Sequence, residues 1–167
     1  LLPNASPSAR FTVFELDKQG QLWFSHGDGI YSMDMGTGEF TYRSEFSYQF
    51  YNAESLTDRQ GNVRYIFGYQ RYKSYPGLFI YELTDGNCIE SSVLLKLPYQ
   101  DSIAVRDVEV LSDTSCLIAS SAGLFRYNLI TKNLLHLPTD DRNSLNTYSI
   151  TSYQDSLFLI GREYGNY

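Results

Sequence analysis

One short phrase occurs three times along this chain, and such a recurrence at a regular spacing constrains the fold more than any single motif. The copies are GIYSMD at 29–34, GLFIYE at 77–82 and GLFRYN at 123–128. In each copy a glycine is followed by an aliphatic residue and then by an aromatic residue. The copies lie about 46 residues apart, which is the length of one unit in several repetitive β folds. We therefore interpret the chain as a series of repeated units.

Turn residues flank the phrase at matching offsets. Upstream, DKQG at 17–20 and DRQG at 58–61 each precede a run of aliphatic and aromatic residues. Downstream, Thr37, Asp85 and Thr131 each stand eight residues after the glycine of the phrase. Such clusters of Gly, Asp, Asn and Thr favour tight turns between short strands. Each unit is therefore predicted to hold four strands joined by turns.

The repeat predicts the position of every strand and of every unit. A fourth glycine, Gly165, follows the apolar run 157–160. The given sequence stops two residues later, so we expect the fourth unit to be incomplete in it. The predicted units are residues 11–46, 47–98, 99–138 and 139–167. The predicted strands are 11–16, 21–26, 29–35, 39–43, 50–57, 62–68, 77–84, 88–97, 104–111, 115–120, 123–129, 133–137, 147–153 and 157–161.

The composition agrees with strands rather than helices. Aromatic residues make up 16% of the chain, with 15 Tyr and 10 Phe against 2 Met, and aromatic side chains favour half-buried sheets. No window keeps an apolar helical stripe over three turns. A β-sandwich is the alternative, but only a propeller requires its hairpins to repeat residues at matching offsets. We predict one all-β domain over 1–167, a partial β-propeller of about three and a half four-stranded antiparallel blades.

The charge pattern excludes several classes of partner. The formal net charge is -6, and Lys and Arg are scattered, so we expect no nucleic-acid surface. We find no apolar run of about 18 residues and no basic-then-apolar leader, and expect no membrane-crossing segment in this stretch. The chain starts without Met, and we expect it to be a piece of a longer protein.

We identify no catalytic, metal or cofactor site in the sequence. Cys88 and Cys116 have no metal-ligand spacing and are predicted to be small buried side chains. His26 precedes Asp28 in SHGDG, but a lone His in a turn is usually a surface residue, and we expect His136 to be half-buried. The serine pairs lack a nucleophile elbow, and the carboxylates in DDRNS at 140–144 lack the glycine of a calcium loop.

The connection before the second phrase differs most between units. GYQRYKSYPG at 68–77 is longer than its counterparts and is rich in Tyr, Arg and Lys. It shares one end of the predicted sheets with residues near His26, Ser120, 140–146 and 161–165. Aromatic rings beside hydrogen-bonding groups suit sugars, although packing over a blade edge or against another domain is the alternative. The predicted ligand-binding residues are Tyr69, Arg71, Tyr72, Tyr75 and Arg162.

Several phrases together resemble the repeat of two-component regulator propellers. They are GLFRYN, LITKNL, TDDRNSLNTYSI and, over nearly a whole repeat, DKQGQLWFSHGDGIYSMDMGTGEF at 17–40. The sequence departs from that repeat at Ser25 and His26, at Arg64 and Tyr65, and in the third unit, which lacks the DxxG glycine.

The resemblance implies a function as well as a fold. It implies the periplasmic sensor ectodomain of a hybrid two-component histidine kinase anchored in the inner membrane, of the kind common in Bacteroides. Such ectodomains respond to oligosaccharides and regulate polysaccharide utilisation. The chain itself would then be a non-enzymatic sensor part, its partners being an oligosaccharide and the remaining blades and domains of the sensor.

Two other functions and one assembly stay open at the level of sequence. A propeller glycosidase or lyase needs paired carboxylates, for which Asp28 and Glu163 are the candidates. A scaffold propeller would instead bind other proteins. Because an incomplete ring leaves strand edges exposed, we also expect a homodimer formed through those edges.

Overall fold

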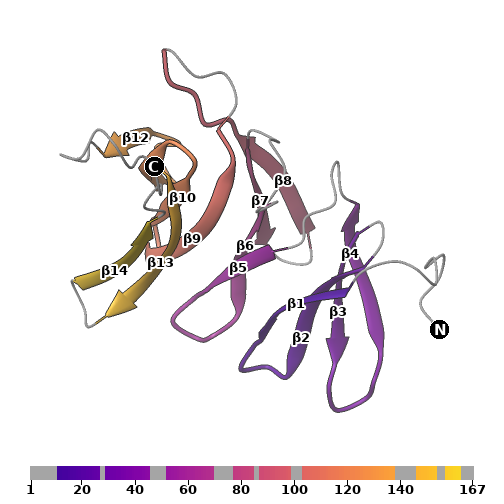
Figure 1. Ribbon diagram of the computed structural model, residues 1–167. Coiled ribbons are helices and arrows are strands. Elements are labelled where there is room, and N and C mark those ends of the chain that lie inside the picture. Colours follow the sequence, from indigo (N-terminus) through magenta and orange to yellow (C-terminus); the bar gives the residue numbers. More distant parts are fainter. Residues whose placement is uncertain are drawn as a thin grey trace. The chain divides into compact units, whose positions relative to one another are not determined.

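The computed structural model of the 167-residue chain consists of antiparallel β strands throughout its described part (Figure 1). The residues described are 11–26, 29–45, 52–69, 77–84, 87–98, 103–137, 146–153 and 157–162. These residues include no helix. Among them, accordingly, no helix has the length and apolar character that a membrane crossing requires.

The strands form three four-stranded sheets and one two-stranded hairpin, with the strands of each in sequence order. Consecutive four-stranded antiparallel meanders of this length are the blades of a β-propeller. The predicted fold class is therefore confirmed: the chain is a partial β-propeller of three blades and half of a fourth. The strands are β1 (Phe11–Leu16), β2 (Gln21–His26), β3 (Gly29–Asp34) and β4 (Phe40–Glu45) in blade 1; β5 (Asn52–Thr57), β6 (Val63–Tyr69), β7 (Leu78–Thr84) and β8 (Asn87–Val93) in blade 2; β9 (Val105–Ser112), β10 (Ser115–Ser120), β11 (Gly123–Asn128) and β12 (Leu134–Leu137) in blade 3; and β13 (Thr147–Tyr153) and β14 (Leu157–Arg162) in blade 4.

The contacts between residues divide the chain into two compact units. The first unit comprises residues 1–68 and 79–91, and the second comprises residues 69–78 and 92–167. Blade 1 lies in the first unit, and blades 3 and 4 lie in the second. The sequence-based assignment of 1–167 to one domain stays a prediction.

Most predicted strands agree with the structure to within two residues at each end. The largest difference is in the eighth strand, which was predicted to continue to Leu97 but ends at Val93. Leu95, two residues further on, is fully buried. The apolar pattern therefore continues past the strand because the following irregular segment also packs into the interior.

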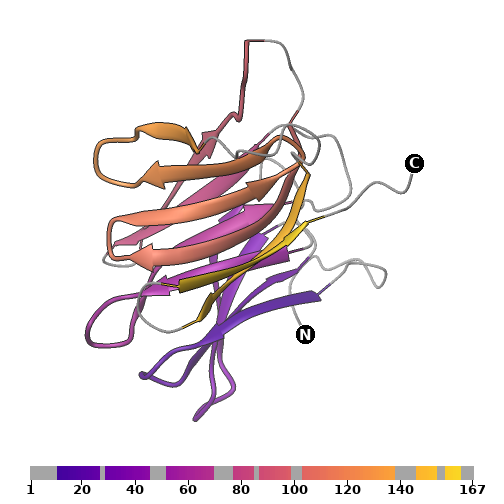
Figure 2. The same ribbon diagram turned by 60° about the vertical axis from the view of Figure 1, so that its left-hand side comes forward.

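The second and third strands of each blade carry most of the core. β10 is buried along its whole length. It pairs with β9 and β11 on its two edges, and its Leu117 and Ala119 pack in one cluster with Ile150 of β13. Figure 2 shows this for the β9–β12 sheet, with the β13–β14 hairpin in gold and yellow beside it. In blade 1, the rings of Phe24 and Tyr31 stack with centroids 5.7 Å apart. Burial also raises the pKa of Tyr81, which is fully inaccessible on β7.

Aspartate closes the turn between the first and second strands. Asp17 Oδ1 accepts hydrogen bonds from Gln19 N and Gln21 N, and its Oδ2 accepts one of 2.9 Å from Trp23 Nε1. Gly20 N donates to Asp17 O, and Gly20 adopts the positive φ of 79° that the turn needs. In blade 2 the more exposed Asp58 accepts from Asn62 N and Asn62 Nδ2 instead, and these bonds lower its pKa.

The turn between the third and fourth strands uses one hydrogen-bond scheme with different residues. Asp34 Oδ1 accepts from the amides of Gly36 and Thr37 in blade 1, and Asn128 Oδ1 accepts from the amides of Ile130 and Thr131 in blade 3. The next turn position has a positive φ in both blades, namely 74° at Gly38 and 54° at Lys132. The third repeat therefore keeps the turn but places a lysine where a left-handed backbone favours glycine.

This difference predicts the effect of a substitution at each of the two positions. Lys132→Gly should raise the free energy of unfolding by about 0.5 kcal/mol, because relief of the left-handed conformation exceeds the entropy cost of glycine. Gly38→Ala should lower it by about 1 kcal/mol. Urea denaturation followed by tryptophan fluorescence measures both, and a destabilised Lys132→Gly variant would show that the lysine makes compensating contacts.

The aspartate turns predict a second pair of effects. Asp17→Ala should lower the free energy of unfolding by about 2 kcal/mol, because it leaves the buried Trp23 N–H without an acceptor. Asp58→Ala is the matched control at the equivalent turn, where the lost partners reach solvent, and its effect should be clearly smaller. Equal losses in urea denaturation would contradict a special role for the Asp17–Trp23 bond.

Candidate functional site

Three residues of the second unit, each on a different strand, meet at the carboxylate of Asp107, near the start of β9. Asp107 Oδ1 accepts a 2.9 Å hydrogen bond from the hydroxyl of Tyr69, the last residue of β6. Its Oδ2 accepts one of 3.0 Å from Ile150 N on β13. Tyr69 and Ile150 are each only 4% exposed. We call Tyr69, Asp107 and Ile150 the Asp107 cluster; it joins strands from blades 2, 3 and 4.

β-bulges place two polar side chains next to this cluster. Along the β9–β10 ladder the register skips Arg106, and along the β13–β14 ladder it skips Tyr148, at the equivalent position. A bulge turns its extra residue away from the regular alternation of the strand. The guanidinium of Arg106 lies over the Tyr148 ring, 5.2 Å from its centroid. Both side chains are half-buried, so this cation–π pair adds a charged and aromatic group to the same end of blades 3 and 4.

The turn between β10 and β11 closes this end of blade 3. Ser120 Oγ donates to Gly123 O at 2.8 Å and accepts from Ala122 N, while Ser121 Oγ accepts from Ala104 N. His136 approaches the same turn, its Nε2 lying 3.1 Å from Ala122 O. These serine hydroxyls hold the turn in place, and none is arranged as a nucleophile beside a base. The half-buried position predicted for His136 agrees with the structure.

His26 differs from its sequence-based prediction. It is paired with Gly29 at the end of β2 and is only 7% exposed, whereas we predicted a surface residue in a turn. The strand continues to His26 because the ladder between β2 and β3 closes with that pair. Asp28, the carboxylate predicted beside it, lies outside the described residues.

The described residues also locate both cysteines. Cys116 is fully buried on β10, and burial raises the pKa of its thiol to about 12. Cys88 is only half-buried, so the prediction of a buried thiol is right for Cys116 and too strong for Cys88. Within the described ranges, no three His, Cys, Asp or Glu side chains come together in a group that could hold a metal ion.

Only part of the predicted ligand-binding set can be located. Tyr69 is described, and its hydroxyl is bound to Asp107 in the second unit. Arg71, Tyr72 and Tyr75 lie outside the described residues. The backbone of Arg162 ends β14 opposite Thr147, and its side chain lies outside the description. Ligand binding by these five residues stays a prediction.

Sequence reasoning did not single out Arg106, Asp107 or Tyr148. One signal was available, because AVRDVEV places three charged residues inside an apolar strand pattern. Such residues usually need a specific partner when a strand is packed on both faces. The identity of the partners could not be predicted, because they come from β6 and β13, about 40 residues away in either direction.

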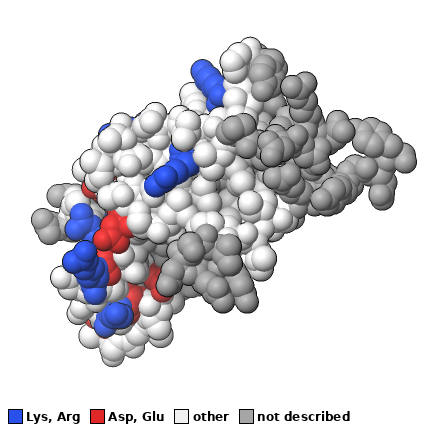
Figure 3. Space-filling model, turned by 90° about the vertical axis from the view of Figure 1, so that its left-hand side faces the viewer, with Lys and Arg blue, Asp and Glu red and all other residues white. Residues whose placement is uncertain are grey.

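Charged side chains of both signs lie beside one another on the face drawn in Figure 3, with wide uncharged areas between them. The described residues on this face form no continuous basic surface of the kind that binds phosphate backbones.

No model of a known protein family matches the chain. No curated protein matches it either.

Solved structures do share its fold. The extracellular domain of BT4673 from B. thetaiotaomicron, described as a one-component system, matches 95% of this chain with a TM-score of 0.58 and 18% identity. That of BT3049 from the same organism, described as a hybrid two-component system, matches 92% with a TM-score of 0.55 and 21% identity. The WD40 domain of SCAP from fission yeast matches 84% with a TM-score of 0.57 and 14% identity.

These matches confirm, at the level of fold, the resemblance to two-component regulator propellers noted in the sequence. The chain spans 20% of the BT4673 chain, 19% of the BT3049 chain and 37% of the SCAP chain. It is thus similar to a part of each of these proteins.

The Asp107 cluster predicts a graded loss of stability. Asp107→Ala should lower the free energy of unfolding by about 3 kcal/mol, because it leaves Tyr69 O–H and Ile150 N–H without their acceptor, and Tyr69→Phe should lower it by about 1 kcal/mol. Glu109→Ala is the matched control, since Glu109 Oε1 accepts from Ser152 N between the same strands but in an exposed position. An Asp107→Ala loss no larger than that of Glu109→Ala would contradict the assigned role.

Proposed function

We propose that this chain is a non-enzymatic sensor part of the periplasmic ectodomain of a hybrid two-component histidine kinase, and that it responds to an oligosaccharide. The observation that carries the proposal is the likeness to extracellular domains of B. thetaiotaomicron signalling proteins, one described as a one-component and one as a hybrid two-component system, over more than nine tenths of the chain. The repeat phrases of the sequence resemble the same class of propeller.

The serine and cysteine side chains described below favour a role in ligand binding over a role in catalysis. The hydroxyls of Ser120 and Ser121 are hydrogen-bonded to backbone groups of their own blade. The thiol of Cys116 is buried and has a raised pKa, so it stays in the unreactive protonated form near neutral pH. The alternative glycosidase or lyase relies on Asp28 and Glu163, which lie outside the described residues, and no observation favours it. None favours the alternative scaffold function either.

The ligand is proposed to bind at the connection that follows Tyr69. Arg71, Tyr72 and Tyr75 lie on this connection, and Arg162 is the fourth proposed contact. Tyrosine rings stack on the apolar face of a pyranose, and arginines hydrogen-bond hydroxyl or carboxylate substituents in a fixed geometry.

The Asp107 cluster supplies a firm base for such a connection. Tyr69 is the last described residue before it, and its hydroxyl is tied to the carboxylate that also binds Ile150 N on β13. A connection anchored at a buried residue loses less conformational freedom when it binds. A rearrangement of the connection on ligand binding would also act on β9 and β13 through the same carboxylate. This is the proposed route by which binding in one blade is passed to the next.

The proposal predicts a specific loss of binding. Oligosaccharides that bind the complete ectodomain are first identified on a glycan array, and their affinity is then measured by calorimetry. Arg71→Ala and Tyr72→Ala should each weaken binding about tenfold or more, equal to about 1.4 kcal/mol. Arg64→Ala, an exposed arginine on β6, is the matched control and should leave the affinity unchanged.

Three results would count against the proposal. If neither variant changes affinity or in-cell signalling, these residues do not form the site. If no glycan binds the complete ectodomain, or if a glycan is turned over by it, the non-enzymatic sensor function is wrong.

A further inference from the structure

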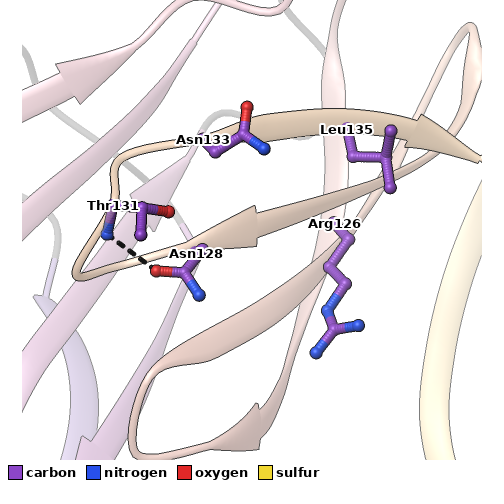
Figure 4. A pocket seen from close by; sticks show the side chains of 5 residues that line it. All are labelled: Arg126, Asn128, Thr131, Asn133 and Leu135. Carbon is purple, nitrogen blue, oxygen red and sulfur yellow. Dashed lines mark hydrogen bonds between the residues drawn. The ribbon is translucent and has the colours of Figure 1, made fainter.

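An open hollow lies on the β11–β12 hairpin of blade 3. It has a volume of about 270 Å³ and is lined by Arg126, Asn128, Thr131, Asn133 and Leu135 (Figure 4). Arg126 of β11 pairs with Leu135 of β12. The two asparagines lie two residues closer to the turn, so the alternation of a strand puts all four side chains on one face. A single hairpin of the second unit therefore forms the hollow.

The two ends of this face differ in how they are covered. Leu124 and Leu137, two residues further from the turn, pack in one cluster with Ile150 of β13. At the end next to the turn, Leu135 is 53% exposed and Arg126 is also exposed. The open end of the face therefore presents an apolar and a positively charged side chain next to each other.

The polar groups of the hollow are mainly hydrogen-bond donors. Figure 4 marks one hydrogen bond between the lining residues, from Thr131 N to Asn128 Oδ1. The same oxygen also accepts from Ile130 N, so it serves to close the turn. The guanidinium of Arg126 and the side-chain amides of the two asparagines supply N–H groups. None of the five lining residues carries a carboxylate.

The β3–β4 hairpin of blade 1 provides an internal reference for this hairpin. Asp34 N donates to Glu39 O, and Asn128 N donates to Asn133 O, both at 2.9 Å. The turns that follow use the same hydrogen-bond scheme, as described above. Positions in the two hairpins can therefore be compared one by one.

The charge at these positions is reversed between the two blades. Two acidic residues give four positions of the blade 1 hairpin a formal charge of -2, and two basic residues give the same positions in blade 3 a charge of +2. The chain as a whole carries a charge of -6, so the blade 3 hairpin differs in sign from its surroundings. The residues exchanged are Ser32 for Arg126, Asp34 for Asn128, Gly38 for Lys132 and Glu39 for Asn133.

The turn itself does not require this positive charge. Blade 1 forms the same turn with Gly38, which has the positive φ that the position needs. Lys132 adopts a φ of 54° there, a conformation that disfavours a residue with a side chain. Strained residues of this kind are concentrated at binding and catalytic sites. The lysine beside the hollow therefore points to a function other than closing the turn.

Blade 1 places an arginine at the same face in a different way. Arg43 Nε donates a 3.0 Å hydrogen bond to Ser32 Oγ, and its guanidinium lies 5.2 Å from the centroid of the Trp23 ring. In blade 3, Arg126 replaces the serine, and its partner on β10 is the apolar Leu117. The arginine of blade 3 lines the hollow instead of covering a tryptophan.

We propose that this hollow binds an acidic sugar residue. Its carboxylate pairs with Arg126, because a guanidinium matches a carboxylate in a two-pronged geometry, and the adjoining Lys132 adds a second positive charge. The amides of Asn128 and Asn133 donate to ring or hydroxyl oxygens, and the apolar face of the ring packs on Leu135. The volume lies just below the roughly 300–1,000 Å³ of sites for drug-sized ligands, which suits a single ring.

The site is additional to the connection that follows Tyr69. The choice of a sugar rests on the proposed function, whereas the preference for an anion rests on the hollow alone. The two proposals can therefore fail separately.

The methyl signals of Leu135 report binding in the full natural polypeptide that contains this chain. NMR titration with D-glucuronate should shift them, with a dissociation constant of about 1 mM, the range of a ligand of one ring. D-Glucose has a similar ring without the carboxylate and should cause no shift. Acetate has the carboxylate without the ring and should bind at least about tenfold more weakly.

Variants that introduce the blade 1 residue separate binding from folding. Asn133→Glu should weaken glucuronate binding at least about tenfold, because it places a like charge at the site. Lys132→Gly should weaken binding about threefold although the same change is expected to stabilise the fold, a combination that a purely structural role would not produce. Arg126→Ala should weaken binding at least about tenfold. Arg64→Ala, at an exposed position on β6, is the control and should have no effect.

The proposal is wrong if Leu135 responds to none of the three probes, or equally to glucuronate and glucose. It is also wrong if acetate binds as tightly as glucuronate, since the hollow would then attract any anion. Shifts that survive both Arg126→Ala and Asn133→Glu would place the ligand elsewhere. A lack of glycan binding at the Tyr69 connection would count against the proposed sensor function but would leave the glucuronate titration unaffected.

Discussion

The structure depends on the requirement that both faces of every middle strand be covered. A four-stranded sheet with aromatic and aliphatic side chains on both faces cannot stay in water by itself, because its exposed apolar area would be too large. In blade 3, β10 meets this requirement along its full length, with one face of the sheet against Ile150 and Phe158 of blade 4. Each blade is thus stable only as one layer of a stack. The order of the strands, the turns and the polar links between sheets follow from that arrangement.

The turns show what the repeat conserves as the chain diverges. Asp34 and Asn128 differ in charge, yet each uses one side-chain oxygen to accept from two backbone amides. The amides of Met35 and Leu129, one residue further on, donate to carbonyls of the preceding turn in both blades. The two turns therefore share their hydrogen-bond pattern rather than their residue types. A residue type can change where the new side chain still makes the same hydrogen bonds. This is why single motifs of the repeat look degenerate in the sequence while their spacing does not.

The sequence predicted the architecture well because the governing signals are local. The alternation of apolar runs and turn residues located β2, β10 and β13 to the residue, and the spacing of Gly29, Gly77 and Gly123 distinguished a propeller from a sandwich. The polar links between sheets were not predicted, because they depend on which distant strands become neighbours. Asp107 illustrates this: its partners on β6 and β13 are set by the stacking of blades. The prediction of a surface position for His26 was wrong because SHGDG resembles a turn in sequence. In the structure, strand β2 continues to His26, which pairs with Gly29.

The buried thiol of Cys116 has a consequence for the compartment in which such a chain works. Thiol–disulfide exchange proceeds through the thiolate, and a thiol with a pKa of about 12 is ionised in only about one molecule in 100,000 at pH 7. Cys116 is also fully buried and cannot be reached by a disulfide-forming partner without unfolding of β10. Folding therefore protects the side chain from oxidation. A propeller of this kind can keep a free cysteine in an oxidising environment, provided that blade 3 folds before Cys116 is oxidised.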